Sequence, residues 1–195
     1  ETFVTDTGTG NTLIDLFGKH HFPEKSYDKD AEIAKKGSVN QALLFHLKDN
    51  LFFKQSFPKT IGPELFSFEY VQSALIKSDQ INITIEDLLA TLTRFSAETI
   101  AEAILLTIKN TDTKIEDFKI YLSGGGANNP LLVNWLKELL SCPFYKSDDL
   151  GISSDAKEAV LFAILANETI AGGTFDFGTK KGIPSVTMGK ISLPD

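Results

Sequence analysis

The feature that most constrains the fold is a short β-prone segment that runs directly into three glycines and then into a helix. Residues 119–123 form the β-prone segment, and an apolar helical pattern begins at Pro130. Asn129 is a favoured helix-capping residue, and proline is favoured at the first helical position. A strand, a glycine turn and a helix in succession are typical of α/β layer architectures, so we expect a sheet flanked by helices.

The same glycine turn is a candidate site for a phosphate or a nucleotide. Glycine lets a ligand approach the backbone, and a helix N-terminus presents free N–H groups at the positive end of its dipole. The pattern fits neither the dinucleotide fingerprint nor the P-loop, since no Gly-Lys-Ser/Thr sequence ends it. On spacing alone, a structural glycine turn is therefore about as well supported as a ligand site.

A second glycine turn, residues 6–11, follows a short β-prone segment near the start of the chain. It contains two glycines separated by one residue, with Asp6 before them and Asn11 after them. For Asp6 the pattern favours a turn or capping role by roughly two to one, because aspartate readily bonds nearby backbone groups. The alternative is a carboxylate at the tip of a strand, which can act as a general base or order Mg²⁺ through water.

Capping residues and apolar periodicity predict further helices. Thr84 begins a capping-box variant, and the pattern after it predicts a long helix to about Asn110. Ser38 is the expected cap of a helix whose apolar face extends to Leu51. Residues 19–30 are expected to form a loop. The segment before that loop is expected to form a short amphipathic helix, with its apolar side chains at Leu13, Ile14, Leu16 and Phe17.

A last helix is expected to start at Asp155 and to run to Ala166. It is apolar nearly all round, which predicts that it packs in the middle of the domain. Asp155 and Glu158 form a D-x-x-E capping box, which is enough to explain both residues. A carboxylate in the first turn of a buried helix can equally face a cleft and bond sugar hydroxyls, so Glu158 is also a candidate substrate contact.

Composition excludes several classes of function. The 19 basic and 26 acidic residues give a net charge of −7, which makes nucleic acid or an anionic membrane a poor partner. The single cysteine, Cys142, excludes an internal disulfide and fits a reducing, cytoplasmic compartment. The three histidines lack metal-ligand spacing, so we expect no metal site built from protein ligands.

Five ordered motifs resemble those of the anhydro-N-acetylmuramic acid kinases, over the chain from Thr5 to about Ala171. Residues 6–11 resemble the family's DTGPGN motif, and residues 124–129 resemble GGGAxN. The other three resemblances are residues 53–66 to PPKSTGREXF, residues 90–97 to the ATLT helix, and residues 151–163 to GI-x-x-D-x-x-EA-x-x-FA. Five motifs in order are far more specific than any one of them.

The resemblance implies a fold and a domain organisation. The fold would be the C-terminal half of an actin-like, ribonuclease H-like ATPase, an α/β fold with a mixed sheet flanked by helices. Residues 1–195 would then be the nucleotide- and sugar-binding domain of a two-domain kinase whose N-terminal domain is absent from this chain. The family's first phosphate loop, MSGTSxDG, does not occur here, and the only methionine is Met188. We therefore expect the later part of a longer polypeptide, homodimeric by analogy with the family.

The resemblance also implies an activity. The family opens 1,6-anhydro-N-acetylmuramic acid with water and phosphorylates oxygen 6 with Mg²⁺ and ATP, in peptidoglycan recycling. By this resemblance Asp6 is the base that activates the water, and Glu158 contacts the sugar. Eight residues would lie near the nucleotide and its phosphates: Thr7, Gly8, Gly10, Asn11, Gly124, Gly125, Gly126 and Asn128.

The sequence departs from the family pattern at a few positions. Thr9 stands in place of a proline and Pro63 in place of an arginine, and the tail after Val186 is shorter. Without the first phosphate loop, the isolated chain is expected to be nearly inactive. Two other functions remain open from the residues: a kinase of the same fold for another sugar, and a non-catalytic domain that senses nucleotides or muropeptides. A sensor needs no base, so the presence of Asp6 favours the enzyme.

Overall fold

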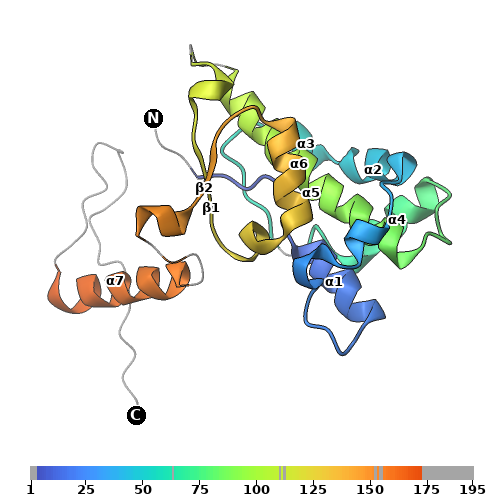
Figure 1. Cartoon of the computed structure of the whole chain (residues 1–195), viewed down its shortest axis with the longest axis horizontal. Coiled ribbons are helices and arrows are strands. Elements are labelled where there is room, and N and C mark those ends of the chain that lie inside the picture. Colours follow the sequence, from blue (N-terminus) through green and yellow to red (C-terminus); the bar gives the residue numbers. More distant parts are fainter. Residues whose placement is uncertain are drawn as a thin grey trace. The chain divides into compact units, whose positions relative to one another are not determined.

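The structure is a computed structural model that describes residues 4–62, 64–109, 111, 113–151, 153 and 156–172 (Figure 1). The chain divides into unit 1 (Glu1–Lys146) and unit 2 (Ser147–Asp195). The elements of unit 1 are α1 (Thr12–His21), η1 (Lys29–Ala31), η2 (Ala34–Lys36), α2 (Gln41–Lys48), α3 (Leu51–Lys54), α4 (Phe68–Lys77), α5 (Ile85–Ile108), η3 (Ile115–Asp117), β1 (Ile120–Leu122), η4 (Gly125–Asn128), α6 (Pro130–Leu139) and β2 (Phe144–Lys146). The elements described in unit 2 are η5 (Ser147–Leu150) and α7 (Lys157–Ala171).

The long helix α5 is the element that links the two hydrophobic cores of unit 1. Its first half packs in a core built with α1, α2 and α4, where Phe95 is fully buried. Its second half packs against α6, and Ala97 and Ala101 are the small residues at that contact. Small side chains let the two helices approach closely, as Figure 1 shows for α5 and α6.

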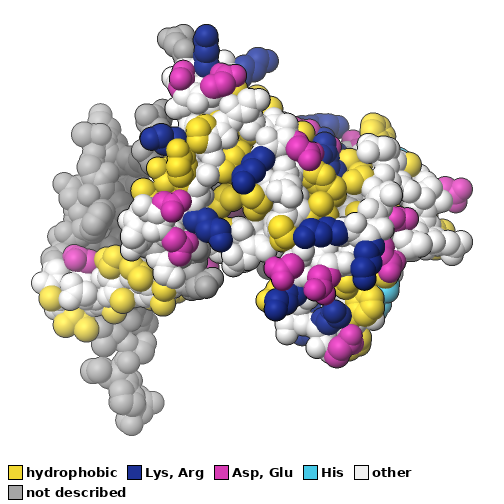
Figure 2. All heavy atoms as spheres, in the orientation of Figure 1, with side chains coloured by type: hydrophobic (Ala, Val, Ile, Leu, Met, Phe, Trp, Pro, Cys, Tyr) yellow, Lys and Arg dark blue, Asp and Glu magenta, His cyan; other side chains and the backbone are white. Residues whose placement is uncertain are grey.

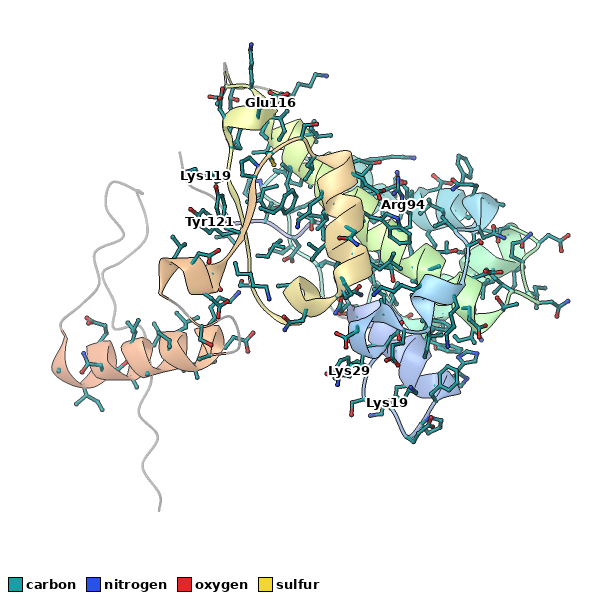
Figure 3. All side chains as sticks on the ribbon, in the orientation of Figure 1. Lys19, Lys29, Arg94, Glu116, Lys119 and Tyr121 are labelled. Atoms are coloured by element: carbon teal, nitrogen blue, oxygen red, sulfur yellow. The ribbon has the colours of Figure 1, made fainter. Side chains whose placement is uncertain are left out.

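Charged residues attach α5 to its neighbours at the surface. Lys48 of α2 bonds Glu98 at 2.7 Å and also pairs with Glu102. Arg94 bonds the same Glu98 at 2.9 Å, and its guanidinium carbon lies 5.6 Å from the ring centre of Trp135 on α6 (Figure 3). Burial alone would raise the pKa of Glu98, but the bonds from Lys48 and Arg94 lower it.

The described sheet consists of two parallel strands. Ile120 pairs with Phe144, Tyr121 with Tyr145 and Leu122 with Lys146. The connection between the strands passes through η4 and α6, because parallel strands need a crossover rather than a tight turn. The mixture of helices and a parallel sheet confirms the expected α/β class.

Local sequence signals confirm three expected elements. The Thr84 side chain accepts a hydrogen bond from Asp87 N at 3.2 Å, and α5 runs close to the predicted end. The Asn129 side chain accepts from Leu132 N at 3.1 Å, with Pro130 in the first turn of α6. The β-prone segment contains β1.

The expected helix cap at Ser38 is wrong. Asn40 is the cap of α2, and its side chain accepts from Leu43 N at 3.0 Å. Ser38 instead donates its backbone N–H to Asp87 Oδ1 at 2.7 Å, a contact with α5 that the local sequence does not reveal. Leu51 is not on the buried face of this helix: it begins α3 and is 76% exposed.

Two helices and one strand are not predicted, and helix α1 extends into an expected loop. The sequence pattern indicates no separate helix at α3, no helix at α4 and no strand at β2, although Val71 and Ala74 of α4 are buried. Strand β2 is three residues long and exists through its pairing with β1, so its own sequence carries little signal. Helix α1 extends to His21, into the segment expected to be a loop.

The expectation for the last helix is also wrong within the described residues. Helix α7 begins at Lys157 after Ala156, with no side-chain cap, and none of its residues is buried. Its exposed apolar residues include Phe162 (67%) and Ile170 (77%), and Figure 2 shows hydrophobic side chains along it. The expected start at Asp155 lies outside the described residues. The apolar composition therefore predicted a helix here correctly, but it did not predict the exposure of that helix.

Candidate nucleotide and catalytic site

The Asp6 carboxylate is held by a segment that lies far from it in the sequence. Asp6 N donates to Lys59 O at 2.9 Å, and Ile61 N donates to Asp6 Oδ2 at 2.8 Å. Thr5 Oγ1 also bonds the Lys59 backbone, donating to its carbonyl at 3.1 Å and accepting from its N–H at 3.0 Å. Asp6 is half-buried. Among the described residues only Ile61 donates to this carboxylate, so Oδ1 is open to water or a ligand.

The first glycine loop, residues 6–11, rests on buried hydroxyl groups of α5. Ser96 Oγ donates to Gly10 O at 2.6 Å and lies 3.0 Å from Thr9 Oγ1. Ser96 is fully buried and Thr9 is 8% exposed. Because buried polar groups need partners, this pairing fixes where the loop can lie on the helix.

Gly8 is required by close contact with the same helix. A Cβ atom on Gly8 would lie 2.8 Å from Thr99 Oγ1, and the φ angle of Gly8 is +156°. Thr99 is itself buried, and its hydroxyl donates to Ser96 O at 3.2 Å. The glycine at this position therefore allows the loop to touch α5.

Asn11 ends the loop at the start of α1. It occupies the N-cap position but makes no side-chain cap bond, and its Oδ1 is buried without a hydrogen-bond partner. Asp15, in the first turn of α1, donates its backbone N–H to Asn11 O at 2.8 Å. Burial, together with the nearby charge of Asp28, raises the pKa of the Asp15 carboxyl.

The second glycine loop, residues 124–128, is held mainly by its own backbone. Gly124 has a φ of +78°, a conformation that favours glycine, and its carbonyl accepts from Ala127 N at 3.0 Å. A Cβ atom on Gly124 or Gly125 would meet nothing within 4 Å. Asn128 is exposed at the end of the turn, directly before the Asn129 cap. The glycines here leave open space over the backbone.

The two glycine loops meet inside unit 1. A Cβ atom on Gly126 would lie 3.9 Å from the unpaired Asn11 Oδ1. The first turns of α1 and α6 follow these two loops directly, and each presents backbone N–H groups at the positive end of a helix. Open glycine backbone and two helix N-termini, which supply N–H donors, fit a phosphate-bearing ligand; the Asn11 oxygen is an acceptor and would need a donor instead.

Thr7 of the first loop lines a pocket of its own. With Thr5 it lines a cavity of about 280 Å³ whose other walls come from the end of α5 and from the region around β1. The cavity is mainly apolar, with Ile104, Ile108 and Ile120 among its lining residues. A role for Thr7 beside the nucleotide stays a prediction.

Glu158, the candidate sugar contact, is exposed in the first turn of α7. It belongs to unit 2, whereas the glycine loops and Asp6 belong to unit 1. The expected first-turn position is confirmed, and a role in binding sugar stays a prediction.

Three site residues were missed because their contacts are long-range. Ser96 and Thr99 support the first loop from α5, and Lys59 supports Asp6 from an irregular segment. A signal for the first two was present in the sequence, since α5 carries hydroxyl residues at positions that its periodicity makes internal. Thr91, Thr93, Ser96 and Thr99 are all buried, and hydroxyls in such positions must bond something.

The residues that the structure describes offer little for other kinds of site. No group of three or more His, Cys, Asp or Glu side chains lies close enough to hold a metal ion. No helix in the same ranges is long and apolar enough to span a bilayer. Burial and the charge of Glu116 raise the pKa of the Cys142 thiol, which disfavours a reactive thiolate.

The fold and site define an α/β domain in which two glycine loops meet, the first of them carrying Asp6, which is held by hydrogen bonds to residues 59–61. Residues 1–187 match the family model described as anhydro-N-acetylmuramic acid kinase. The chain is 46% identical over 198 aligned residues to the anhydro-N-acetylmuramic acid kinase of Pseudoalteromonas atlantica, and 39% identical over 199 to that of Caldanaerobacter subterraneus. The chain belongs to the anhydro-N-acetylmuramic acid kinase family.

These alignments cover 99% of this chain in both cases, but only 48% and 49% of the two relatives. A third relative, from Francisella tularensis, is 35% identical over 99% of this chain and 49% of its own length. The chain thus spans about half the length of the curated relatives it matches.

Proposed function

We propose that this chain is the nucleotide- and sugar-binding half of a two-domain, ATP-dependent kinase acting on 1,6-anhydro-N-acetylmuramic acid. Its fold would be the C-terminal half of an actin-like ATPase, and the preceding half would supply the first phosphate loop. Residues 1–195 would form that C-terminal domain in a cytoplasmic, homodimeric enzyme of peptidoglycan recycling. Family membership and the half-length alignments support this organisation.

The observation that carries the proposal is the meeting of the two glycine loops at Asn11 and Gly126. ATP phosphates bound there would accept hydrogen bonds from backbone N–H groups and would lie at the positive ends of two helix dipoles. Gly8, Gly10 and Asn11 would lie nearest the phosphates, and Gly124, Gly125, Gly126 and Asn128 nearer the rest of the nucleotide. Thr7 would act through the backbone of its loop.

Magnesium would enter with the nucleotide. Mg²⁺ keeps several waters and is commonly held by substrate phosphates with one or two carboxylates. This fits the described residues, which form no cage of three or more acidic, histidine or cysteine side chains. When bound, Mg²⁺ neutralises charge on the transferring phosphoryl group.

Asp6 would be the general base. Its Oδ2 is held by Ile61 N, and its Oδ1 is open to accept a proton from water. The water oxygen bonds carbon 1 of the sugar, the bond from carbon 1 to the bridging oxygen breaks, and that oxygen attacks the γ-phosphorus as ADP leaves. The product is N-acetylmuramic acid 6-phosphate, and Glu158 would bond the sugar hydroxyls.

Mass spectrometry of the reaction tests this function. The parent polypeptide, comprising this chain and the segment before it, is incubated with Mg-ATP and 1,6-anhydro-N-acetylmuramic acid. We expect a product that has gained one water and one phosphoryl group, and we expect Asp6→Asn to abolish it. The 195-residue chain alone should give almost none.

Three results would change the proposal. Tight ATP binding without product favours a nucleotide sensor. Phosphorylation of other sugars but not of the anhydro sugar favours a kinase of the same fold with another substrate. Full activity of Asp6→Asn would remove Asp6 from the role of base.

A further inference from the structure

Lys59 is a buried cation that the proposed chemistry leaves unused. It is 9% exposed, and none of the ion pairs between described residues includes it. Its Nζ donates to Phe52 O at 2.7 Å. The ring centres of Phe52, Phe57 and Phe53 lie 4.3, 5.0 and 5.9 Å from the same nitrogen.

Burying the Lys59 ammonium in this way lowers the stability of the fold. A buried charge without a carboxylate loses hydration that one carbonyl and three aromatic faces only partly replace. Burial accordingly lowers the pKa of the Lys59 ammonium. Lysine is therefore a poor choice for this position on stability alone, because a methionine would fill the same volume without the desolvation cost.

The segment around Lys59 holds both the backbone and the carboxylate of Asp6. Lys59 O accepts from Asp6 N, and both its N–H and its carbonyl bond Thr5 Oγ1. Two residues later, Ile61 N donates to Asp6 Oδ2 at 2.8 Å. A shift of this segment along Asp6 would move the donor away from Oδ2 and change the direction of Oδ1.

Nothing regular holds this segment in place. Residues 58–61 belong to no helix or strand, and Pro58 and Thr60 are exposed. Its anchors are the side chain of Lys59, inserted among the phenylalanines, and Ile61, which packs on the first core. Of these two side chains, only that of Lys59 makes a hydrogen bond, to Phe52 O in the first turn of α3.

We propose that Lys59 is the positioning residue of Asp6: its ammonium, fixed on Phe52 O and among three phenylalanine rings, sets the segment whose backbone orients the carboxylate. This inference rests on the proposed function, since it takes Asp6 as the base. The Lys59 ammonium bonds Phe52 O and not the Asp6 carboxylate, so its proposed effect on the rate passes through the backbone that holds Asp6.

The test uses the parent polypeptide with Lys59→Met, which keeps the apolar stem and removes the ammonium. We expect kcat to fall at least tenfold, with KM for ATP unchanged within twofold, because Lys59 bonds the first loop at Asp6 and not at the residues proposed to bind the nucleotide. Lys59→Arg keeps a cation and a donor and should recover part of the lost kcat. The matched control is Lys77→Met, at an exposed lysine of α4, which should leave kcat unchanged.

A second pair of measurements separates positioning from folding. Amide hydrogen exchange at Ile61 should accelerate at least tenfold in Lys59→Met, while amides of Leu88 and Leu89 in α5 keep their protection. Thr5→Val breaks the same frame from the Asp6 side with Lys59 intact. It should lower kcat with unchanged KM, and its loss should not add to that of Lys59→Met.

The outcomes separate the two claims. If the unmodified parent makes no product, the proposed function fails, and exchange at Ile61 still decides the structural claim. If the parent is active and needs Asp6, an unchanged kcat in Lys59→Met or in Thr5→Val overturns the inference. Additive losses in the double variant, or no recovery with arginine, also overturn it.

Discussion

The two glycine loops of unit 1 use the same residue for opposite purposes. In the first loop, Gly8 brings the chain into contact with Thr99, and Ser96 of α5 bonds Gly10 O. In the second loop, a Cβ atom on Gly124 or Gly125 would meet nothing. Gly8 is needed for contact with a helix, whereas Gly124 and Gly125 leave the backbone open.

This difference suits the two loops to different roles in the proposed site. The first loop also carries Asp6, whose carboxylate must keep one orientation, and its position is fixed by a buried helix. The second loop has open backbone, as a surface that receives a ligand requires. Substitutions in the first loop should therefore change stability most, and those in the second should change binding most.

The largest expected effect is that of Gly8→Ala. The new Cβ would lie 2.8 Å from Thr99 Oγ1 in a backbone conformation with φ of +156°, so both overlap and strain follow. We expect the free energy of unfolding to fall by about 3 kcal/mol. Urea unfolding of the chain, followed by fluorescence of its single tryptophan, Trp135, measures it.

The matched substitution in the other loop is Gly125→Ala, where a Cβ meets no atom within 4 Å. It should change the free energy of unfolding by less than about 0.5 kcal/mol and weaken ATP binding in the parent polypeptide. Equal destabilisation by the two alanines would show that the loops do not differ as described.

The next effect is the loss of the hydroxyl support in Ser96→Ala. This change leaves Gly10 O and Thr9 Oγ1 without their buried partner, and we expect a loss of about 1–3 kcal/mol in the same unfolding assay. Adding Thr9→Val should cost less than the two single changes summed, because both remove the same contact. Strict additivity would contradict the pairing.

A smaller effect is expected from Asn129→Ala, which removes the cap that holds the second loop to α6. The lost bond to Leu132 N should cost about 1 kcal/mol of unfolding free energy. Asn134→Ala, at an exposed position of the same helix, is the control and should be nearly neutral. Similar losses at both positions would indicate a general propensity effect instead of a cap.

The smallest effect concerns the ionic contacts of α5 and depends on pH. The bonds from Lys48 and Arg94 lower the pKa of Glu98 from its ordinary 4.5, although burial opposes them. The folded carboxyl therefore adds stability above pH 4.5, which is lost as pH falls through the lowered pKa. Glu98→Gln should lose about 1 kcal/mol at pH 7, and the deficit should shrink below pH 4.5.

A deficit of constant size at every pH would contradict this assignment. The measurement is urea unfolding of the chain and the variant at several pH values between 3 and 7, with the ionic strength held constant because salt screens such pairs.

The sequence predicted those parts of the fold whose signals are local. Thr84 and Asn129 each cap a helix through a bond to an amide three residues ahead, so a short window contains the whole motif. Ser38 and Asn40 are both residues that commonly cap helices, and Asn40 is the one that caps α2. The backbone N–H groups of Ser38 and Asn40 bond Asp87 and Thr91 of α5. Long-range contacts of this kind are not visible in a window.

The candidate site was predicted to a similar extent. Motif resemblance identified Asp6 and both glycine loops, but not the residues that hold them, because Ser96 and Lys59 lie far away in the sequence. The burial expected for α7 failed for a related reason, since the pattern indicates an apolar helix without indicating its partner. Apolar periodicity predicts which face of a helix is hydrophobic, but whether that face is buried depends on the tertiary structure.

The central claim is that the two glycine loops form one phosphate-binding site. Amide hydrogen exchange of the parent polypeptide, with and without saturating Mg-ATP, tests it most directly. We expect amides of residues 8–11 and 124–128 to become protected together, over the same range of ATP concentration. Protection of one loop alone, or of neither while ATP is bound, would contradict it.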